Sequence, residues 1–407
     1  MKWMTNVIIT LALLVLVPVF SAAGEVTTVD GVTHVANPAT PPGGVQDLKL
    51  EELWRRGGED DDVIFGVIIQ ALVDEEGNVY LLDGQLSEVQ VFDADGEFVK
   101  TLSREGDGPG EVRQPFDMLW MPDGSLGLVQ SFPGKIIQVT LEDTPAGTFQ
   151  KQGEAGAIIA VVEAEGDGGN LVMGGVDVEI TQGGQLRHMF VSGFDAEGNE
   201  TAQYVSYDVT WDFADFVLRE SEQYLMLFGR WDVAADGSVI TAVNHEDYEL
   251  KFHAADGTLQ RVVTREHEPL KRDEEGYEVM RGFLEGMKRM FPFPVETEYR
   301  DMESPVNLLF VHPNGDIWVQ PMRGVRGQPE GVLAVYDVFS SEGHFLRQVR
   351  VSCPGDGMTD GIVFASADRM LVIHGLLDSM SGLFGGSGEE VDEEARPVEV
   401  VCYRISE

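Results

Sequence analysis

The fold is decided by two neighbouring stretches of the chain, ALVDEEGNVYLLD at residues 71–83 and EVQVFDADGEFVKTL at residues 88–102. Each consists of an apolar run, a short polar turn with a glycine, and a second run rich in β-forming residues. This pattern is typical of a β-hairpin, because alternate side chains of a strand point to opposite faces of its sheet. Two hairpins in series predict one four-stranded antiparallel sheet.

The same plan recurs along the chain. Clear copies occupy residues 118–150, 230–263 and 308–351, and a more degenerate copy occupies residues 157–205. A final copy, at residues 362–405, stops after its third strand. Regular repetition of one unit is the signature of a repeat architecture.

The strand that the last copy lacks is present near the start of the chain. The segment LKLEELWRRGGED, residues 48–60, resembles a fourth strand followed by the same exit as residues 102–106. Five complete units plus one divided between the two ends predict a closed ring, which hides sheet edges that would otherwise pair with other chains. We therefore predict an all-β fold, a six-bladed β-propeller whose last blade is completed by an N-terminal strand, with one helical insertion. Five or seven blades are the alternatives.

A glycine-rich stretch, REGDGPGE at residues 104–111, could be a phosphate-binding loop or a corner between two blades. A phosphate-binding loop needs a lysine after its last glycine and a helix behind it. Neither is present, and an aromatic and apolar strand pattern follows instead. Glycines supply the positive φ that a chain reversal needs, and Pro109 stiffens it. The corner is the favoured interpretation.

The motifs NVYLLD and VQVFDADGEFVKTL, followed by GDGPGE and a proline before the next blade, resemble those of secreted bacterial six-bladed β-propellers related to NHL-repeat and TolB-like proteins. The resemblance covers most of residues 45–405. It implies the propeller fold. It implies no single function, because that scaffold carries lyases, lactonases, peptide binders and proteins without known activity.

The first 23 residues are typical of a secretory signal peptide. Lys2 precedes an apolar run at residues 7–20, and small residues at Ser21 and Ala23 suit cleavage before Gly24. We predict a secreted or periplasmic protein. Its expected parts are a signal peptide at 1–23, an N-terminal extension or linker at 24–44, and a propeller at 45–407 that contains an insertion with a helix at about 266–304 and a flexible acidic loop at about 376–397.

The chain is strongly acidic, with a formal net charge of −42. Such a charge repels phosphate backbones and anionic lipids, so we expect no nucleic-acid partner and no membrane insertion after signal cleavage. Cationic ligands, divalent ions and basic partners are compatible with it. The two cysteines, Cys353 and Cys402, each adjoin an apolar strand-like run, which favours two buried thiols over a disulfide bridge.

The longer connections between strands, at 208–227, 265–304, 321–332 and 375–397, are expected on one face of the ring, opposite the tight turns. Insertions on one rim of a rigid scaffold often carry recognition. The insertion at 265–304 contains a predicted helix at 272–291, capped by Asp273 and carrying one apolar stripe. This stripe is expected to pack on the blades as a lid; an exposed dock for a partner is the alternative.

Counting back from the turn of each clear repeat brings polar residues to the mouth of the central channel. The candidate ligand-binding residues are Asp117, Arg230, Asn307, Gln320, His374 and, at the edge, Arg113. A calcium site of the lactonase kind needs several converging oxygen ligands, and this register offers one carboxylate. We therefore predict no metal ligands, with calcium as the alternative. FDADGE, residues 92–97, lacks the distal glutamate of a calcium loop and is better explained as a turn.

These observations favour a monomeric, non-catalytic binding module for a small molecule, glycan, peptide or protein partner. The alternatives are a metal-assisted hydrolase or lyase with its site at the propeller axis, and a structural subunit of an assembly.

Overall fold

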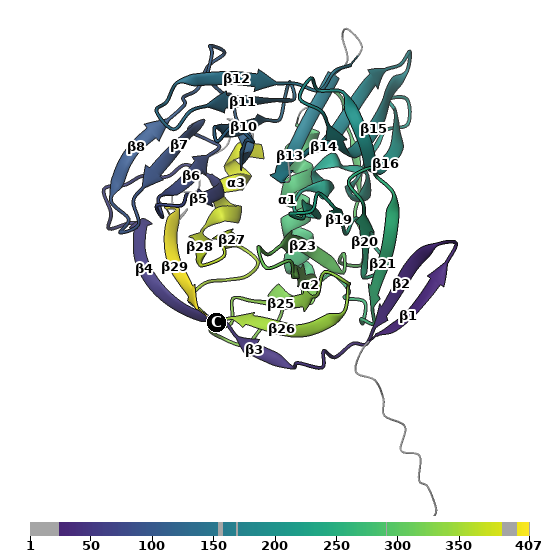
Figure 1. Ribbon diagram of the computed structural model, residues 1–407. Coiled ribbons are helices and arrows are strands. Elements are labelled where there is room, and N and C mark those ends of the chain that lie inside the picture. Colours follow the sequence, from purple (N-terminus) through teal and green to yellow (C-terminus); the bar gives the residue numbers. More distant parts are fainter. Residues whose placement is uncertain (1–23, 154–157, 168–169, 290, 385–396, 407) are drawn as a thin grey trace, which may run out of the picture.

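The computed structural model describes residues 24–153, 158–167, 170–289, 291–384 and 397–406. These residues form six β-sheets arranged in a ring around a central axis (Figure 1). A seventh sheet consists of two short parallel strands from the long connections, β17 (Val217–Arg219) and β22 (Glu296–Glu298). The predicted six-bladed propeller is therefore confirmed. The predicted signal peptide, residues 1–23, lies outside the described residues, as do residues 385–396 of the expected acidic loop.

Each blade is a four-stranded antiparallel meander whose first strand lies nearest the axis. Blades 1 and 2 consist of β5 (Ile68–Val73), β6 (Val79–Asp83), β7 (Glu88–Phe92), β8 (Phe98–Leu102), β9 (Pro115–Trp120), β10 (Leu126–Gln130), β11 (Lys135–Val139) and β12 (Pro145–Phe149). Blades 3 and 4 consist of β13 (Ile158–Asp167), β14 (Asn170–Ile180), β15 (Gly184–Phe194), β16 (Glu200–Asp212), β18 (Trp231–Val233), β19 (Val239–Thr241), β20 (Glu249–His253) and β21 (Leu259–Arg265). Blades 5 and 6 consist of β23 (Val306–Val311), β24 (Ile317–Pro321), β25 (Ala334–Phe339), β26 (Phe345–Val351), β27 (Gly361–Ser366), β28 (Arg369–His374), β29 (Glu399–Ser406) and β4 (Lys49–Gly57).

The ring is closed by the N-terminal strand, as predicted. β4 pairs antiparallel with β29, so that Trp54 lies opposite Cys402 and Arg56 opposite Val400. Trp54 also stacks on Phe92 of blade 1, with ring centroids 5.9 Å apart. The strand therefore joins the last blade to the first.

The hydrophobic core is divided among the gaps between blades. Trp54, Leu371 and Ile68, for example, belong to one buried cluster between blades 6 and 1, and comparable clusters fill the other gaps. Every sheet is thus covered on both faces, which explains why the strands read as mixed apolar runs and not as strict alternation. Burial of these clusters is the main stabilising contribution to the ring.

Blade 3 differs from its expected boundaries. Its strands are longer than those of the other blades, and β16 continues to Asp212. Trp211, which was assigned to a long connection, is therefore a buried strand residue. The reason is the alternating run YVSYDVTWD, which continues the strand pattern beyond residue 205.

The N-terminal extension forms additional strands at the outer edge of the ring. β1 (Glu25–Val29) and β2 (Val32–Asn37) make a hairpin, and β2 pairs parallel with β21 of blade 4. The short strand β3 (Val45–Asp47) then pairs parallel with β26 of blade 5. Buried Asn37 fixes this path, because its side-chain amide donates to Gly343 O at 2.9 Å and accepts from Phe345 N–H at 2.9 Å.

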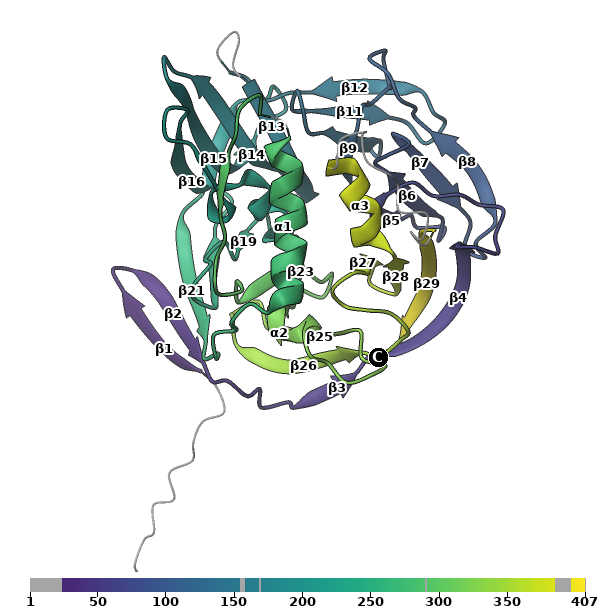
Figure 2. The same cartoon turned by 180° about the vertical axis from the view of Figure 1, so that it is seen from behind.

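One long helix and a shorter one lie over the long-loop face, the face of the ring opposite the tight turns (Figure 2). The longer helix, α1 (Glu274–Lys288), is capped by Asp273, whose carboxylate accepts from Gly276 N–H at 3.0 Å. Leu284 and Met287 of its apolar stripe are buried against blade 3. The lid interpretation of this stripe is therefore confirmed.

The second helix, α3 (Leu376–Phe384), lies beside α1 in Figure 2 and contacts it. It occupies the start of the segment that was expected to be a flexible acidic loop. Its sequence LLDSMSGLF is apolar, and Leu376 packs on the cluster between blades 6 and 1. A third, four-residue helix, α2 (Met322–Val325), follows β24.

The REGDGPGE stretch turns a corner between blades 1 and 2. Glu111 organises it: its carboxylate accepts from Gly108 N–H and from Arg104 Nε, both at 2.8 Å. Arg104 O accepts from Val112 N–H at 3.1 Å, which closes the loop on itself. Of the three glycines only Gly110 has a positive φ, of 76°, as expected for a chain reversal. Gly106 and Gly108 leave room for the Glu111 carboxylate, which a Cβ at either position would meet.

Both thiols are unpaired and buried. Burial raises the pKa of Cys353 to about 11 and that of Cys402 to about 12. In the part of the chain that the structure describes, no helix is long and apolar enough to cross a membrane.

Candidate functional site

The predicted site residues fall into separate groups. Asn307 Nδ2 donates to Gln320 Oε1 at 2.6 Å, and Gln320 Nε2 donates to the buried hydroxyl of Tyr336 at 3.0 Å. The structure therefore joins two of the six. Arg113 lies apart from them, because its guanidinium binds Glu105 and Asp107 of the REGDGPGE corner at the surface. A ligand-binding role for these residues stays a prediction.

His374, at the end of β28, belongs to a different group. Its Nδ1 lies 2.8 Å from Asp360 Oδ2, and its Nε2 lies 3.9 Å from Glu399 Oε2. Asp360 also accepts from the backbone N–H groups of Asp356 and Gly375. These bonds hold the pKa of Asp360 below its usual value in spite of its partial burial.

Asp117, in the first strand of blade 2, connects neighbouring blades. Its Oδ2 accepts from Ala164 N–H of blade 3 at 2.9 Å, and its Oδ1 accepts from Gln70 of blade 1 at 3.2 Å. Glu163 of blade 3 accepts in the same way from Gly229 N–H, and Asp232 of blade 4 accepts from Val311 N–H at 2.6 Å. Carboxylates at the first strands of blades 2, 3 and 4 thus form hydrogen bonds to the next blade or to the chain that leads into it.

Burial makes the ionised form of these carboxylates unfavourable. Burial raises the pKa of Asp117 to about 6, and burial together with the charge of Asp117 raises the pKa of Glu163 well above its usual range. The sequence register missed Glu163 because it was counted only for the clear repeats, and Glu163 lies in the degenerate copy at residues 157–205. The register selects one position in each clear repeat, which is Arg230 in blade 4. It therefore missed Asp232, which lies two positions closer to the turn.

Arg230, immediately before β18, contacts a histidine and not a carboxylate. Its Nη1 lies 3.2 Å from His245 Nδ1, and His245 Nδ1 lies 2.9 Å from Ser304 Oγ. Because a guanidinium only donates, Nδ1 is the acceptor and the imidazole carries its proton on Nε2. Burial, followed by the charges of Arg230 and Arg300, lowers the pKa of His245 to about 3, so the ring is neutral.

A buried ion network joins the long loops beneath α1. Arg272 binds both oxygens of Glu220 at 2.7 Å and also binds Glu303, which in turn pairs with Arg326. The four side chains are at most 8% exposed. They belong to three different connections, so the network holds these loops in one arrangement.

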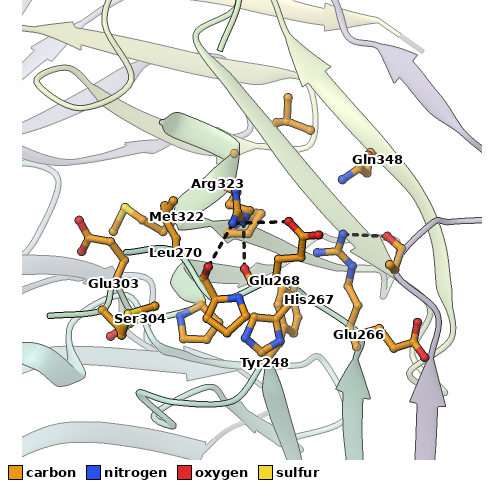
Figure 3. Close-up of a pocket in the computed structure, with 18 of the residues that line it drawn as sticks. Tyr248, Glu266, His267, Glu268, Leu270, Glu303, Ser304, Met322, Arg323 and Gln348 are labelled. Carbon is orange, nitrogen blue, oxygen red and sulfur yellow. Dashed lines mark hydrogen bonds and ion pairs between the residues drawn. The ribbon is translucent and has the colours of Figure 1, made fainter. Parts of the chain in front are cut away.

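A pocket with a volume of about 630 Å³ opens on the long-loop face between blades 4 and 5. Figure 3 shows Tyr248 and His267 on one side of it and Arg323 on the other. Arg323 is fixed by the backbone, since its guanidinium donates to the carbonyl oxygens of Glu268 and Pro269 (Figure 3). His245 and Ser304 line the pocket, which links it to Arg230.

One wall of the pocket is anchored on the buried Asp337. This carboxylate accepts from Arg265 at 2.6 Å, from the hydroxyl of Tyr248 at 2.8 Å and from Gln348 at 2.9 Å. Burial raises the pKa of Asp337 in spite of the arginine, and burial and the Asp337 charge raise that of Tyr248. Three strands of two blades are thereby held around one charge.

The remaining lining is largely apolar, and its mouth is acidic. Apolar contacts come from Leu270, Met302, Pro305, Pro321, Met322, Pro329 and Val335. Exposed carboxylates at the rim come from Glu246, Glu266 and Glu268. The repeat pattern does not predict these lining residues, because most of them lie in connections that differ from blade to blade. The unusual length of these connections was the only indication of the pocket in the sequence.

Within the described residues, no group of three or more histidine, cysteine, aspartate or glutamate side chains is arranged to hold a metal ion. The oxygens of Asp117 and Glu163 are occupied by the backbone bonds described above.

The fold defines the chain as a six-bladed β-propeller. No protein-family model matches it, and no curated protein matches it. Its structural neighbours include an exported-protein candidate from Bacteroides fragilis (12% identity, 92% of this chain and 100% of that chain, TM-score 0.48) and a member of the DUF4221 family from Bacteroides vulgatus (11%, 88% and 98%, 0.47). A gluconolactonase from Xanthomonas campestris also resembles it (10%, 90% and 91%, 0.44). At these identities and TM-scores the neighbours say nothing about what this chain binds or catalyses.

Proposed function

We propose that this protein is an exported propeller that binds a ligand in the pocket between blades 4 and 5. The observation that supports this role is the pocket itself. Its volume of about 630 Å³ lies in the range of small-molecule sites, and its lining combines apolar walls with a few fixed polar groups. The pocket would hold a small molecule, or one end of a glycan or peptide, between two rigid blades.

Preorganisation also supports a binding role. Asp337 holds Arg265, Tyr248 and Gln348 in place, and the buried ion network orders the loops that form the opposite wall. A ligand that enters such a site loses little free energy to the ordering of the protein. Export rests on the signal-like pattern of residues 1–23, and nucleic acid is disfavoured as a ligand by the net charge of −42.

A thermal-shift panel of sugars, short peptides and small organic acids tests this proposal. A ligand at 100 times its dissociation constant stabilises the folded state by about 2.7 kcal/mol. We expect Leu270→Trp, which fills the pocket, to abolish the shift of any positive compound. Leu86→Trp, at an exposed position of blade 1, is the matched control. A shift that survives Leu270→Trp unchanged would place the site elsewhere.

The same assay separates the binding role from a metal-assisted hydrolase or lyase at the axis. We expect EDTA followed by calcium to leave the melting temperature within about 2 °C, because the axial carboxylates already bind backbone N–H groups. A larger, reversible calcium shift that Asp117→Ala removes would favour the enzyme.

A further inference from the structure

Arg230 is a buried cation without a carboxylate partner. The residue is 7% exposed, and among the described residues its guanidinium forms no ion pair, only the contact with His245. The other buried arginines differ: Arg272 binds two glutamates, and Arg187 lies 3.9 Å above the ring of Trp211. A buried charge normally requires a counter-charge, because transfer from water to the protein interior is costly.

A second guanidinium increases this excess of positive charge. Arg300 donates to His245 O at 2.8 Å and pairs with Glu246, whose side chain is 73% exposed. Burial and the nearby Arg300 lower the pKa of Arg230 to about 10, which leaves it charged at neutral pH. The carboxylate of Glu220 is already engaged by Arg272.

His245 connects Arg230 to the wall of the pocket. Its Nδ1 accepts from Arg230, so its Nε2 is a hydrogen-bond donor, and both His245 and Ser304 line the pocket. The Ser304 hydroxyl donates to the same Nδ1, so the end of the pocket lined by His245 offers one free side-chain donor among the described residues, the Nε2–H group, backed by two guanidiniums. We propose that this end binds the oxyanion, a carboxylate or a phosphate, of a ligand whose apolar part lies against Leu270 and Met322. This inference rests on the proposed function.

The acidic rim does not reverse this preference. Glu246, Glu266 and Glu268 are exposed to solvent, where salt and water screen their charges. The field of the buried Arg230 guanidinium is screened much less, so it decides which ligand charge is favoured inside the pocket. The rim would select against an anion only at the stage of encounter.

The inference is tested first on the unmodified protein, with four probes that share a phenyl ring: phenylacetate, phenyl phosphate, phenylacetamide and 2-phenylethylamine. Calorimetric titration at pH 7.5 and constant ionic strength gives their dissociation constants. We expect at least one of the two anions to bind about tenfold more tightly than the neutral amide, the difference that a charge-assisted hydrogen bond supplies. The preferred anion distinguishes carboxylate from phosphate.

Two variants with opposite expected effects follow. Arg230→Gln should weaken binding of the preferred anion about tenfold and leave binding of the amide unchanged. Arg404→Gln, at an exposed arginine of β29 that does not line the pocket, is the matched control and should change neither. Glu246→Gln removes the acidic partner of Arg300. Because Glu246 is exposed, this substitution should not affect folding. It should strengthen anion binding, by up to about fivefold.

Equal binding of amide and anions, or tighter binding of the amine, would overturn the inference while leaving the pocket as a ligand site. No strengthening in Glu246→Gln would also count against it. If none of the four probes binds, the oxyanion site is wrong, and the proposed function is then judged by the ligand panel and Leu270→Trp alone.

Discussion

The two faces of the ring are built by different means. On the turn face, most of the described tight turns are closed by their own residues. A side-chain oxygen accepts the N–H two positions later, as at Asp74, Asp93, Asp123, Asp195, Asp236 and Asp256. On the long-loop face, the corresponding bonds join distant segments, such as Arg272 with Glu220 and Arg300 with His245. The turn face repeats one local structure in blade after blade. The long-loop face is held together by contacts between segments that are distant in the sequence, and these contacts do not repeat.

This difference indicates where specificity resides. A repeated turn can be exchanged for another turn with little consequence for the rest of the molecule. The long-loop face depends on buried charges that must all be present, and it contains the pocket.

The largest effect is expected from loss of the closing strand. Deletion of residues 45–57 removes β3 and β4 and uncovers the buried residues of β29, so we expect no cooperative unfolding transition in a urea titration followed by circular dichroism. Deletion of residues 25–37, which removes only the outer hairpin, is the control and should leave a cooperative transition. A deletion protein that stays monomeric and equally cooperative without residues 45–57 would contradict the closed ring.

The next largest effect is expected in the buried ion network. Arg272→Met leaves Glu220 and Glu303 as buried charges without their partner, which should lower the free energy of unfolding by about 3–5 kcal/mol. Arg281→Met, which removes an exposed pair with Glu278 on α1, should lower it by no more than about 1 kcal/mol. Equal losses in the two variants would remove the contrast between buried and exposed pairs.

A smaller effect is expected from the axial carboxylates, and it depends on pH. Burial raises the pKa of Asp117 from 3.8 to about 6, so the folded state holds this proton more tightly than the unfolded state does. The resulting stabilisation is complete below about pH 4 and is lost as the pH rises through 6; for Asp117 it is about 3 kcal/mol.

The measurement is the free energy of unfolding between pH 4 and pH 7.5. The double variant Asp117→Asn, Glu163→Gln should lose this component, so its stability should change less with pH than that of the unmodified protein. Glu75→Gln, in an exposed turn, serves as the control and should keep the original dependence. A double variant with the original dependence would mean that other groups cause it.

The smallest effect is expected on the turn face. Asp195→Ala removes the acceptor for Glu197 N–H and Asn199 N–H, which should lower the free energy of unfolding by about 1 kcal/mol. Asp195→Asn keeps an acceptor and should cost only part of that. Chemical denaturation measures both. A loss as large as that of Arg272→Met would show that this face is not locally organised.

The contrast between the faces also explains what the sequence could reveal. The ring, its closure at Trp54 and the cap of α1 follow from periodicity and local hydrogen bonds, so they could be predicted from single stretches of chain. The pocket could not, because Tyr248, Arg265 and Gln348 meet only through Asp337. Arg230 was recognised by its place in the repeat, but its unusual partner, His245, lies in a connection that no repeat position describes.

The long-range pairing of the N-terminal segment affects the order in which the chain can fold. β2 pairs with β21, β3 with β26 and β4 with β29, so these early strands lack these partners until later parts of the chain are synthesised, and β4 waits for the last strand. Until then its edges are open to pairing with other chains, and the slow step of assembly should be the capture of this leading segment.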